Sequence, residues 1–234
     1  MKKRLQSYVG VIACVLLPIL GNAQFNFGLI GGVANYQGDV AKDLTDVQET
    51  HFALGGSLGY RISPELDIKA QIVLTKLSGN DANYTERQYR GFKFESNIVE
   101  FAGILDYYVL GSSTRSSTGV FVPKFTPLVY AGLGFTKVDN TAECFSSDCI
   151  NNVIDPPFPE KDAKSMLFTV PFGLGFKYDA SPLLAFGIRG GYRYSFSDYL
   201  DGISKAANEG KNDWYFVLGA NVIFYIVPKE TGGF

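Results

Sequence analysis

The chain of 234 residues contains a single histidine, three cysteines and a net charge of only −2. A tetrahedral metal site needs more nitrogen and sulfur ligands than these, so we expect no metal and no cofactor. The near-neutral charge argues against nucleic acid as a partner, because nucleic acid requires a basic face. After the first two dozen residues, no stretch is hydrophobic enough for a membrane helix. These absences exclude several common classes of protein.

Residues 1–23 have the composition of a secretory signal peptide. Three basic residues open it, an apolar run follows over 9–20, and Gly-Asn-Ala at 21–23 is a small-residue cleavage site. We therefore expect one domain, residues 24–234. A lipoprotein-like box ends at Cys14, but the apolar run continues past that cysteine, which disfavours lipidation.

The mature chain alternates apolar with polar or small residues at a period of two. In the clearest segment, Phe52, Leu54 and Leu58 share one face, and the small residues between them share the other. Successive side chains of a strand point to opposite faces, so such a segment has an apolar side and a polar side. Eight segments follow this pattern: 25–36, 51–62, 66–77, 97–110, 125–138, 165–178, 183–196 and 214–227. Behind a signal peptide, the pattern predicts an all-β fold, an eight-stranded antiparallel transmembrane β-barrel of the OmpA/OmpX architecture in the outer membrane.

The connections between these segments alternate in length and so predict the orientation of the barrel. Residues 63–65 and 179–182 are tight turns, whereas 37–50, 78–96, 139–164 and 197–213 are long and polar. Short turns lie on the periplasmic side and long loops outside, which places both termini in the periplasm. The connection 111–124 is long for a periplasmic turn. It is either a flexible linker or a site that meets a periplasmic partner.

Charged residues occupy the polar faces of the predicted strands. An eight-stranded barrel is only wide enough for side chains to fill it, which excludes a pore for large solutes. Charges inside it must pair or hold water. The predicted charge network of the lumen comprises Arg61, Asp67, Lys69, Glu100, Asp106, Lys177, Arg189 and Arg193. It is either a structural plug or a narrow ion path.

The only candidate for acid–base catalysis is His51, which lies near Glu49 and Asp46 in the sequence. Hydrolytic sites generally need a histidine beside a serine or a carboxylate. A polar residue at the membrane rim explains His51 equally, and no nucleophile motif accompanies it. We therefore expect a protein that is not an enzyme and has no catalytic residues.

Cys144 and Cys149 form an even pair once the signal peptide is removed. In an oxidising compartment such a pair favours a local disulfide that stiffens a loop.

The segment Asn35-Tyr36-Gln37-Gly38-Asp39 closes the first predicted strand. It resembles a family of small outer-membrane barrels whose first strand ends in Asn-Tyr-x-Gly-Asp, the PorG type. Residues 127–134, 187–193 and 198–201 carry the same resemblance, which extends over nearly all of the mature chain. The best-known member of that family belongs to the type IX secretion apparatus. The resemblance implies a barrel that anchors a periplasmic ring through lipoprotein and ring subunits.

Two functions remain open from the sequence. One is a non-catalytic membrane anchor or assembly component embedded in outer-membrane lipids, for which the resemblance implies a place in the type IX secretion system. The other is a surface-binding or envelope-stabilising barrel of the OmpA/OmpX kind, which acts through its extracellular loops.

Overall fold

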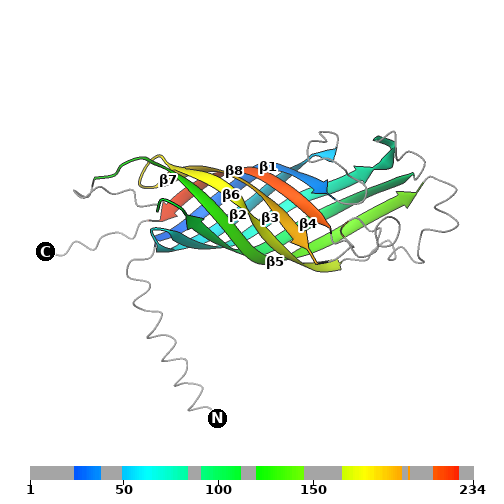
Figure 1. Cartoon of the computed structure of the whole chain (residues 1–234), viewed down its shortest axis with the longest axis horizontal. Helices are drawn as coiled ribbons and strands as arrows, with labels where there is room; N and C mark the ends of the chain where they lie inside the picture. Colours follow the sequence, from blue (N-terminus) through cyan, green and yellow to red (C-terminus); the bar gives the residue numbers. More distant parts are fainter. Residues whose placement is uncertain are drawn as a thin grey trace, which may run out of the picture.

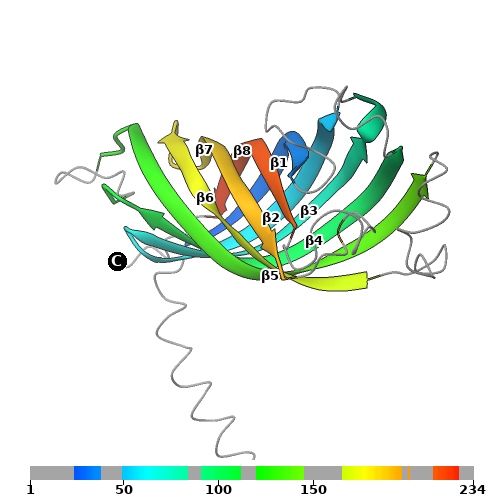
Figure 2. The same cartoon turned by 45° about the vertical axis from the view of Figure 1, so that its right-hand side comes forward.

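The chain folds into one closed sheet of eight antiparallel strands. The computed structural model describes residues 24–37, 49–83, 91–111, 120–144, 165–196, 200 and 213–226. The strands are β1 (Gln24–Gln37), β2 (His51–Ser63), β3 (Leu66–Asn80), β4 (Phe92–Tyr108), β5 (Lys124–Cys144), β6 (Ser165–Asp179), β7 (Leu184–Ser195) and β8 (Trp214–Ile226), with a short 3₁₀ helix η2 (Asp81–Asn83) after β3. Each strand pairs with the next, and β1 also pairs with β8. Figures 1 and 2 show the strands crossing the long axis obliquely, as closure of a barrel requires. The predicted eight-stranded barrel is confirmed.

Within the described ranges, no helix is both long enough and apolar enough to span a lipid bilayer.

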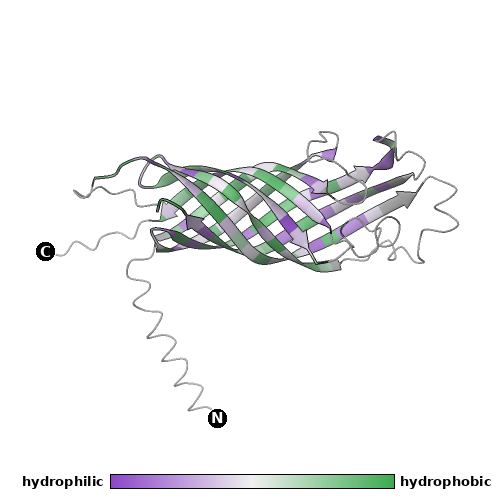
Figure 3. Ribbon diagram, in the orientation of Figure 1, coloured by the Kyte–Doolittle hydropathy of each residue, from purple (hydrophilic) through white to green (hydrophobic). Residues whose placement is uncertain are grey.

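The alternation of the sequence becomes the two walls of the barrel. Phe52, Leu54 and Leu58 of β2 are 85%, 63% and 67% exposed on the outside, whereas Ala53 between them is buried. Large apolar side chains cover the outside of all eight strands. Figure 3 shows these hydrophobic residues along the middle of the barrel and hydrophilic ones towards the end with the long connections. An apolar surface of this extent is stable against lipid and unfavourable in water. We call it the apolar belt.

The two ends of the barrel differ. At the end we call the turn end, the connections after β2 and β6 are tight, and Phe25 of β1 pairs with Ile226 of β8. The described chain therefore begins and ends at the turn end. The connections after β1, β3, β5 and β7 are longer and leave the opposite end, the loop end.

At the loop end, β3 to β5 run further than the hydrophobic pattern predicts. Phe92 pairs with Cys144, so residues 78–80, 92–96 and 139–144 belong to strands. The prediction of loops over all of 78–96 and 139–164 was wrong for these residues. The outward positions there include Lys93 and Glu95. Strands above the belt face water on the outside, so their outer positions need no apolar residues and the alternation loses contrast.

The interior has an apolar section near the loop end and an aromatic one lower down. Tyr36, Phe94 and Leu77 are fully buried in the first, and the Tyr36 and Phe94 rings meet edge to face at 4.8 Å. In the lower section, Tyr130 lies against the paired glycines Gly173 and Gly191. A Cβ on Gly191 would overlap the Tyr130 hydroxyl, so glycine makes room for this ring inside a narrow barrel.

Candidate functional site

The barrel lumen brings together all eight charged residues of the predicted network. They come from β2, β3, β4, β6 and β7, and every one of them points inward because it occupies the inner phase of its strand. Each makes an ion pair across or along the lumen. The pairs form three layers between the turn end and the loop end.

The layer nearest the turn end is electrically neutral. Arg61 Nε lies 3.0 Å from Asp67 Oδ1, directly across the β2–β3 pair. Lys177 Nζ lies 3.2 Å from Asp179 Oδ2. The Tyr225 hydroxyl accepts from Lys177 at 3.1 Å and donates to Asp179 at 2.9 Å. Two cations and two carboxylates therefore neutralise one another behind the short turns.

The middle layer contains one carboxylate and two cations. Asp106 pairs with Lys69 at 2.7 Å and also with Arg189. The Arg189 guanidinium lies 4.9 Å from the centre of the Tyr130 ring, within range of a cation–π interaction. Asp106 is fully buried, so its charge depends on these two partners.

The third layer joins Glu100 to Arg193. The Arg193 Nε and Glu100 Oε2 atoms are 3.6 Å apart, an ion pair that is too long for a hydrogen bond. The Tyr215 hydroxyl donates to Glu100 Oε2 at 2.6 Å. In the middle and third layers, ion pairs between β4 and β7 thus cross the lumen. Side chains that fill the lumen in this way block the passage of large solutes.

Sequence reasoning missed Asp179 and several lumen tyrosines, among them Tyr108, Tyr215 and Tyr225. Asp179 was assigned to the turn after β6, although it follows Lys177 by two positions and so shares its inner face. Tyr108 follows Asp106 in the same way and donates to Asp67 at 2.9 Å. The period of two could have identified all four residues.

At the loop end, His51 and Ser78 lie side by side. The His51 Nε2 and Ser78 Oγ atoms are 2.8 Å apart, and the Ser78 hydroxyl donates to the Glu49 carboxylate. Asn83 of η2 donates to the other Glu49 oxygen at 2.6 Å. Burial, and secondly the charge of Lys76, lowers the pKa of His51 from its ordinary value of 6.5. The predicted neighbour Asp46 lies outside the described residues.

This cluster differs from the serine–histidine pair of a catalytic nucleophile in the direction of its hydrogen bonds. A serine has one proton, and here Ser78 gives it to Glu49, which only accepts. His51 Nε2 must then donate to Ser78, so it is not placed to take the serine proton as a base would. The cluster cross-links β2, β3 and η2 at the rim of the barrel.

Asp213 links the end of β1 to Leu200 at the loop end. Tyr36 donates to Asp213 Oδ1 at 2.8 Å, and the backbone N–H of Leu200 donates to Asp213 Oδ2 at 3.1 Å. Leu200 is fully buried, and its carbonyl accepts from Ser96 at 2.8 Å. Asn35 donates to Thr50 at 3.2 Å. Gln37 ends the strand, and Gly38 and Asp39 lie outside the described residues.

Tyr36 and Leu200, which come from two segments that carried the family resemblance, therefore meet at one carboxylate. Asp213 immediately precedes β8, and no sequence pattern singled it out. Cys144 is the last residue of β5, and its predicted partner Cys149 lies outside the described residues, so the disulfide stays a prediction.

The connection between β4 and β5 carries exposed apolar residues at both of its described ends. Val109 and Leu110 leave β4 with 52% and 64% exposure, and Val120 and Val122 approach β5 with 63% and 48%. Gly111 adopts a φ of +60°, a conformation that glycine tolerates. Lys124 fixes the base of the connection by donating to the Leu110 carbonyl at 2.9 Å.

In the part of the chain that the structure describes, no three His, Cys, Asp or Glu side chains gather as a metal site would require.

A closed barrel with an apolar belt outside and ion pairs inside defines the class of eight-stranded transmembrane β-barrels. Within it, the chain belongs to the family described as a domain of unknown function, DUF6089, whose model matches residues 6–228. No curated protein is similar enough in sequence to match this chain.

Solved structures of small outer-membrane barrels are also similar to it. The N-terminal barrel domain of Pseudomonas aeruginosa OprF shares 14% identity at a TM-score of 0.40, covering 86% of this chain and 97% of that one. Neisserial surface protein A shares 16% identity at a TM-score of 0.44, covering 87% and 97%. The attachment invasion locus protein Ail of Yersinia pestis, in complex with a heparin analogue, shares 11% identity at a TM-score of 0.38, covering 87% and 99%.

Proposed function

We propose that this protein is a non-catalytic outer-membrane barrel that anchors or helps to assemble a periplasmic complex. The apolar belt supports a position in the membrane, with outer-membrane lipids as its surroundings. Short turns of such barrels face the periplasm, so we expect the turn end and both chain ends to lie on the periplasmic side.

The observation that carries the anchor function is the connection between β4 and β5. Four exposed apolar residues among its described positions, Val109, Leu110, Val120 and Val122, lie at the turn end, beyond the ion pairs of the lumen. An apolar surface at the periplasmic end of a barrel favours contact with another protein. The resemblance to PorG-type barrels suggests that this partner is a lipoprotein or ring subunit of a type IX secretion apparatus.

The experiment replaces Leu110 and Val122 with Glu and compares the variant with Asn97→Glu, which puts one carboxylate on an exposed position towards the loop end. After cross-linking in native outer membranes, ring lipoprotein should co-purify with the parent and with the Asn97 variant, and should be lost from the double variant. Heat-modifiable migration on a gel verifies that each barrel is folded. The proposal fails if ring subunits never co-purify and a deletion strain secretes normally.

A second candidate function is surface binding through the extracellular loops. It is favoured by the extension of β3 to β5 above the belt, which raises the loop end into the medium. Deleting residues 145–164 distinguishes the two functions, because a periplasmic anchor tolerates the deletion and a surface binder does not.

A further inference from the structure

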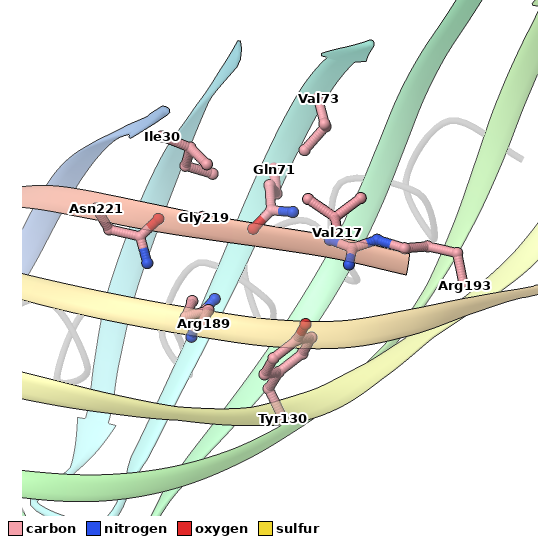
Figure 4. A pocket seen from close by; sticks show the side chains of 9 residues that line it. All are labelled: Ile30, Gln71, Val73, Tyr130, Arg189, Arg193, Val217, Gly219 and Asn221. Carbon is pink, nitrogen blue, oxygen red and sulfur yellow. The ribbon is translucent and has the colours of Figure 1, made fainter. Parts of the chain in front are cut away.

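A small cavity lies inside the lumen between the middle and third layers. Its volume is about 20 Å³. About 10–15 Å³ is enough for one water molecule, so the cavity has room for one small ion. Figure 4 shows the side chains of Gln71, Tyr130, Arg189, Arg193 and Asn221 converging on it from β3, β5, β7 and β8.

The polar lining of this cavity is rich in hydrogen-bond donors and carries positive charge. Arg189 and Arg193 supply two guanidinium groups, Tyr130 a hydroxyl, and Gln71 and Asn221 amide groups. Its nine lining residues include no carboxylate. The remaining lining is apolar, with Val217 and Gly219 of β8 among it.

The charges around the cavity do not cancel. Lys69, Arg189 and Arg193 contribute three positive charges, whereas Asp106 and Glu100 contribute two negative ones. The layer at the turn end is already neutral. The buried carboxylate of Asp213 accepts from Tyr36 and from the Leu200 N–H towards the loop end and is not part of the cavity lining. An uncompensated charge in a buried site is costly, which favours a counter-ion.

A buried donor in the cavity wall also lacks a partner. Arg193 Nε has no hydrogen-bond acceptor among the described residues, since its nearest carboxylate oxygen is 3.6 Å away. The side chain is 5% exposed. Figure 4 shows its guanidinium between Val217 and Tyr130, at the centre of the lining residues.

We propose that this cavity binds one monovalent anion the size of chloride, held between Arg189 and Arg193. The ion neutralises the excess charge and accepts the Arg193 Nε hydrogen bond. Gluconate is too large for the space. This site is independent of the proposed anchor function, because it lies inside the lumen and involves no partner protein.

The test follows unfolding of the purified full chain in detergent micelles by urea, using the fluorescence of its single tryptophan, Trp214. Sodium chloride replaces sodium gluconate at constant ionic strength. Chloride should stabilise the barrel saturably, and the unfolding equilibrium constant should fall about 11-fold when chloride reaches ten times its dissociation constant. Crystals soaked in bromide should show one anomalous peak between the two arginines.

Two pairs of variants separate a specific site from general screening. Arg193→Gln should abolish the chloride effect, whereas Arg61→Gln, which removes a lumen arginine away from the cavity, should keep it. Gly219→Ala fills the cavity without changing a charge, and its Cβ meets a flexible Ile30 methyl at 3.3 Å. The matched Gly31→Ala change lies on the outer face, where the new Cβ meets nothing within 4 Å.

Equal stability in chloride and gluconate would overturn the proposal, because the cavity then binds no anion. Equal weakening of the chloride effect by both arginine variants would also overturn it. If Gly219→Ala does not fold, the Arg193 comparison and the bromide peak still decide the question.

Discussion

Replacing Asp106 with Asn removes the one carboxylate that compensates two buried cations. The substitution keeps the size of the side chain and one acceptor oxygen, but Lys69 at 2.7 Å and Arg189 lose their counter-charge. Both Lys69 and Asp106 are almost entirely buried, with side-chain exposures of 3% and 0%. Removing one partner of a buried pair costs about 3–5 kcal/mol of unfolding free energy, so we expect a loss in this range.

A matched control is the ion pair between Lys76 and Glu95 at the loop end. Its charged atoms are 2.5 Å apart, but its side chains are 39% and 45% exposed. Exposed pairs contribute about 0–1 kcal/mol, so Lys76→Gln should change stability by less than about 1 kcal/mol. Because both pairs are short, burial alone accounts for the expected difference.

Reversible urea unfolding in detergent micelles measures both variants, with an unchanged slope of free energy against urea as the check that the folded barrel is intact. If Asp106→Asn destabilises the barrel no more than Lys76→Gln, the lumen is hydrated well enough to screen its charges. The description of the lumen as a packed ionic plug would then be refuted.

Three further predictions concern the rim and the interior. Folding lowers the pKa of His51, so just below pH 6.5 the unfolded chain binds more protons than the folded one. The parent should therefore lose stability relative to His51→Gln as the pH falls through that window. Identical profiles of stability against pH would contradict this. Tyr36→Phe should lower the unfolding free energy by about 1 kcal/mol, because Asp213 loses a buried donor. Hydrogen exchange at the Leu200 backbone N–H, which donates to the same carboxylate, should become faster. Gly191→Ala should lower the unfolding free energy by about 1–3 kcal/mol in the same urea assay, because its Cβ would overlap the Phe172 carbonyl and the Tyr130 hydroxyl; an unchanged midpoint would show that both can move.

The alternation of the sequence predicted the fold because lipid and lumen impose opposite demands on neighbouring residues. Where lipid is present, Phe52, Leu54 and Leu58 must be apolar, and the strand is visible in the sequence. Above the belt, water surrounds β4 near Lys93 and Glu95, so its first residues have no such constraint and were predicted as loop.

The inward direction of the charges was predictable from the same phase, but their pairing was not. Phase gives the side of the wall, whereas the register across several strands decides that Asp106 meets both Lys69 and Arg189. The contact of His51 with Ser78 and the bridge from Tyr36 to Asp213 also depend on long-range geometry. No local period encodes contacts between residues so far apart in the chain.

The pairing of β1 with β8 determines the order of events during biogenesis. The first and last strands of the chain share one ladder, in which Phe25 lies opposite Ile226. Until β8 has been synthesised and exported, β1 has an open edge whose N–H and C=O groups cannot be left unpaired in hydrocarbon. Insertion of a truncated chain is therefore disfavoured, and a polypeptide that lacks β8 should stay outside the membrane. Delivery to the membrane has to wait for the whole chain.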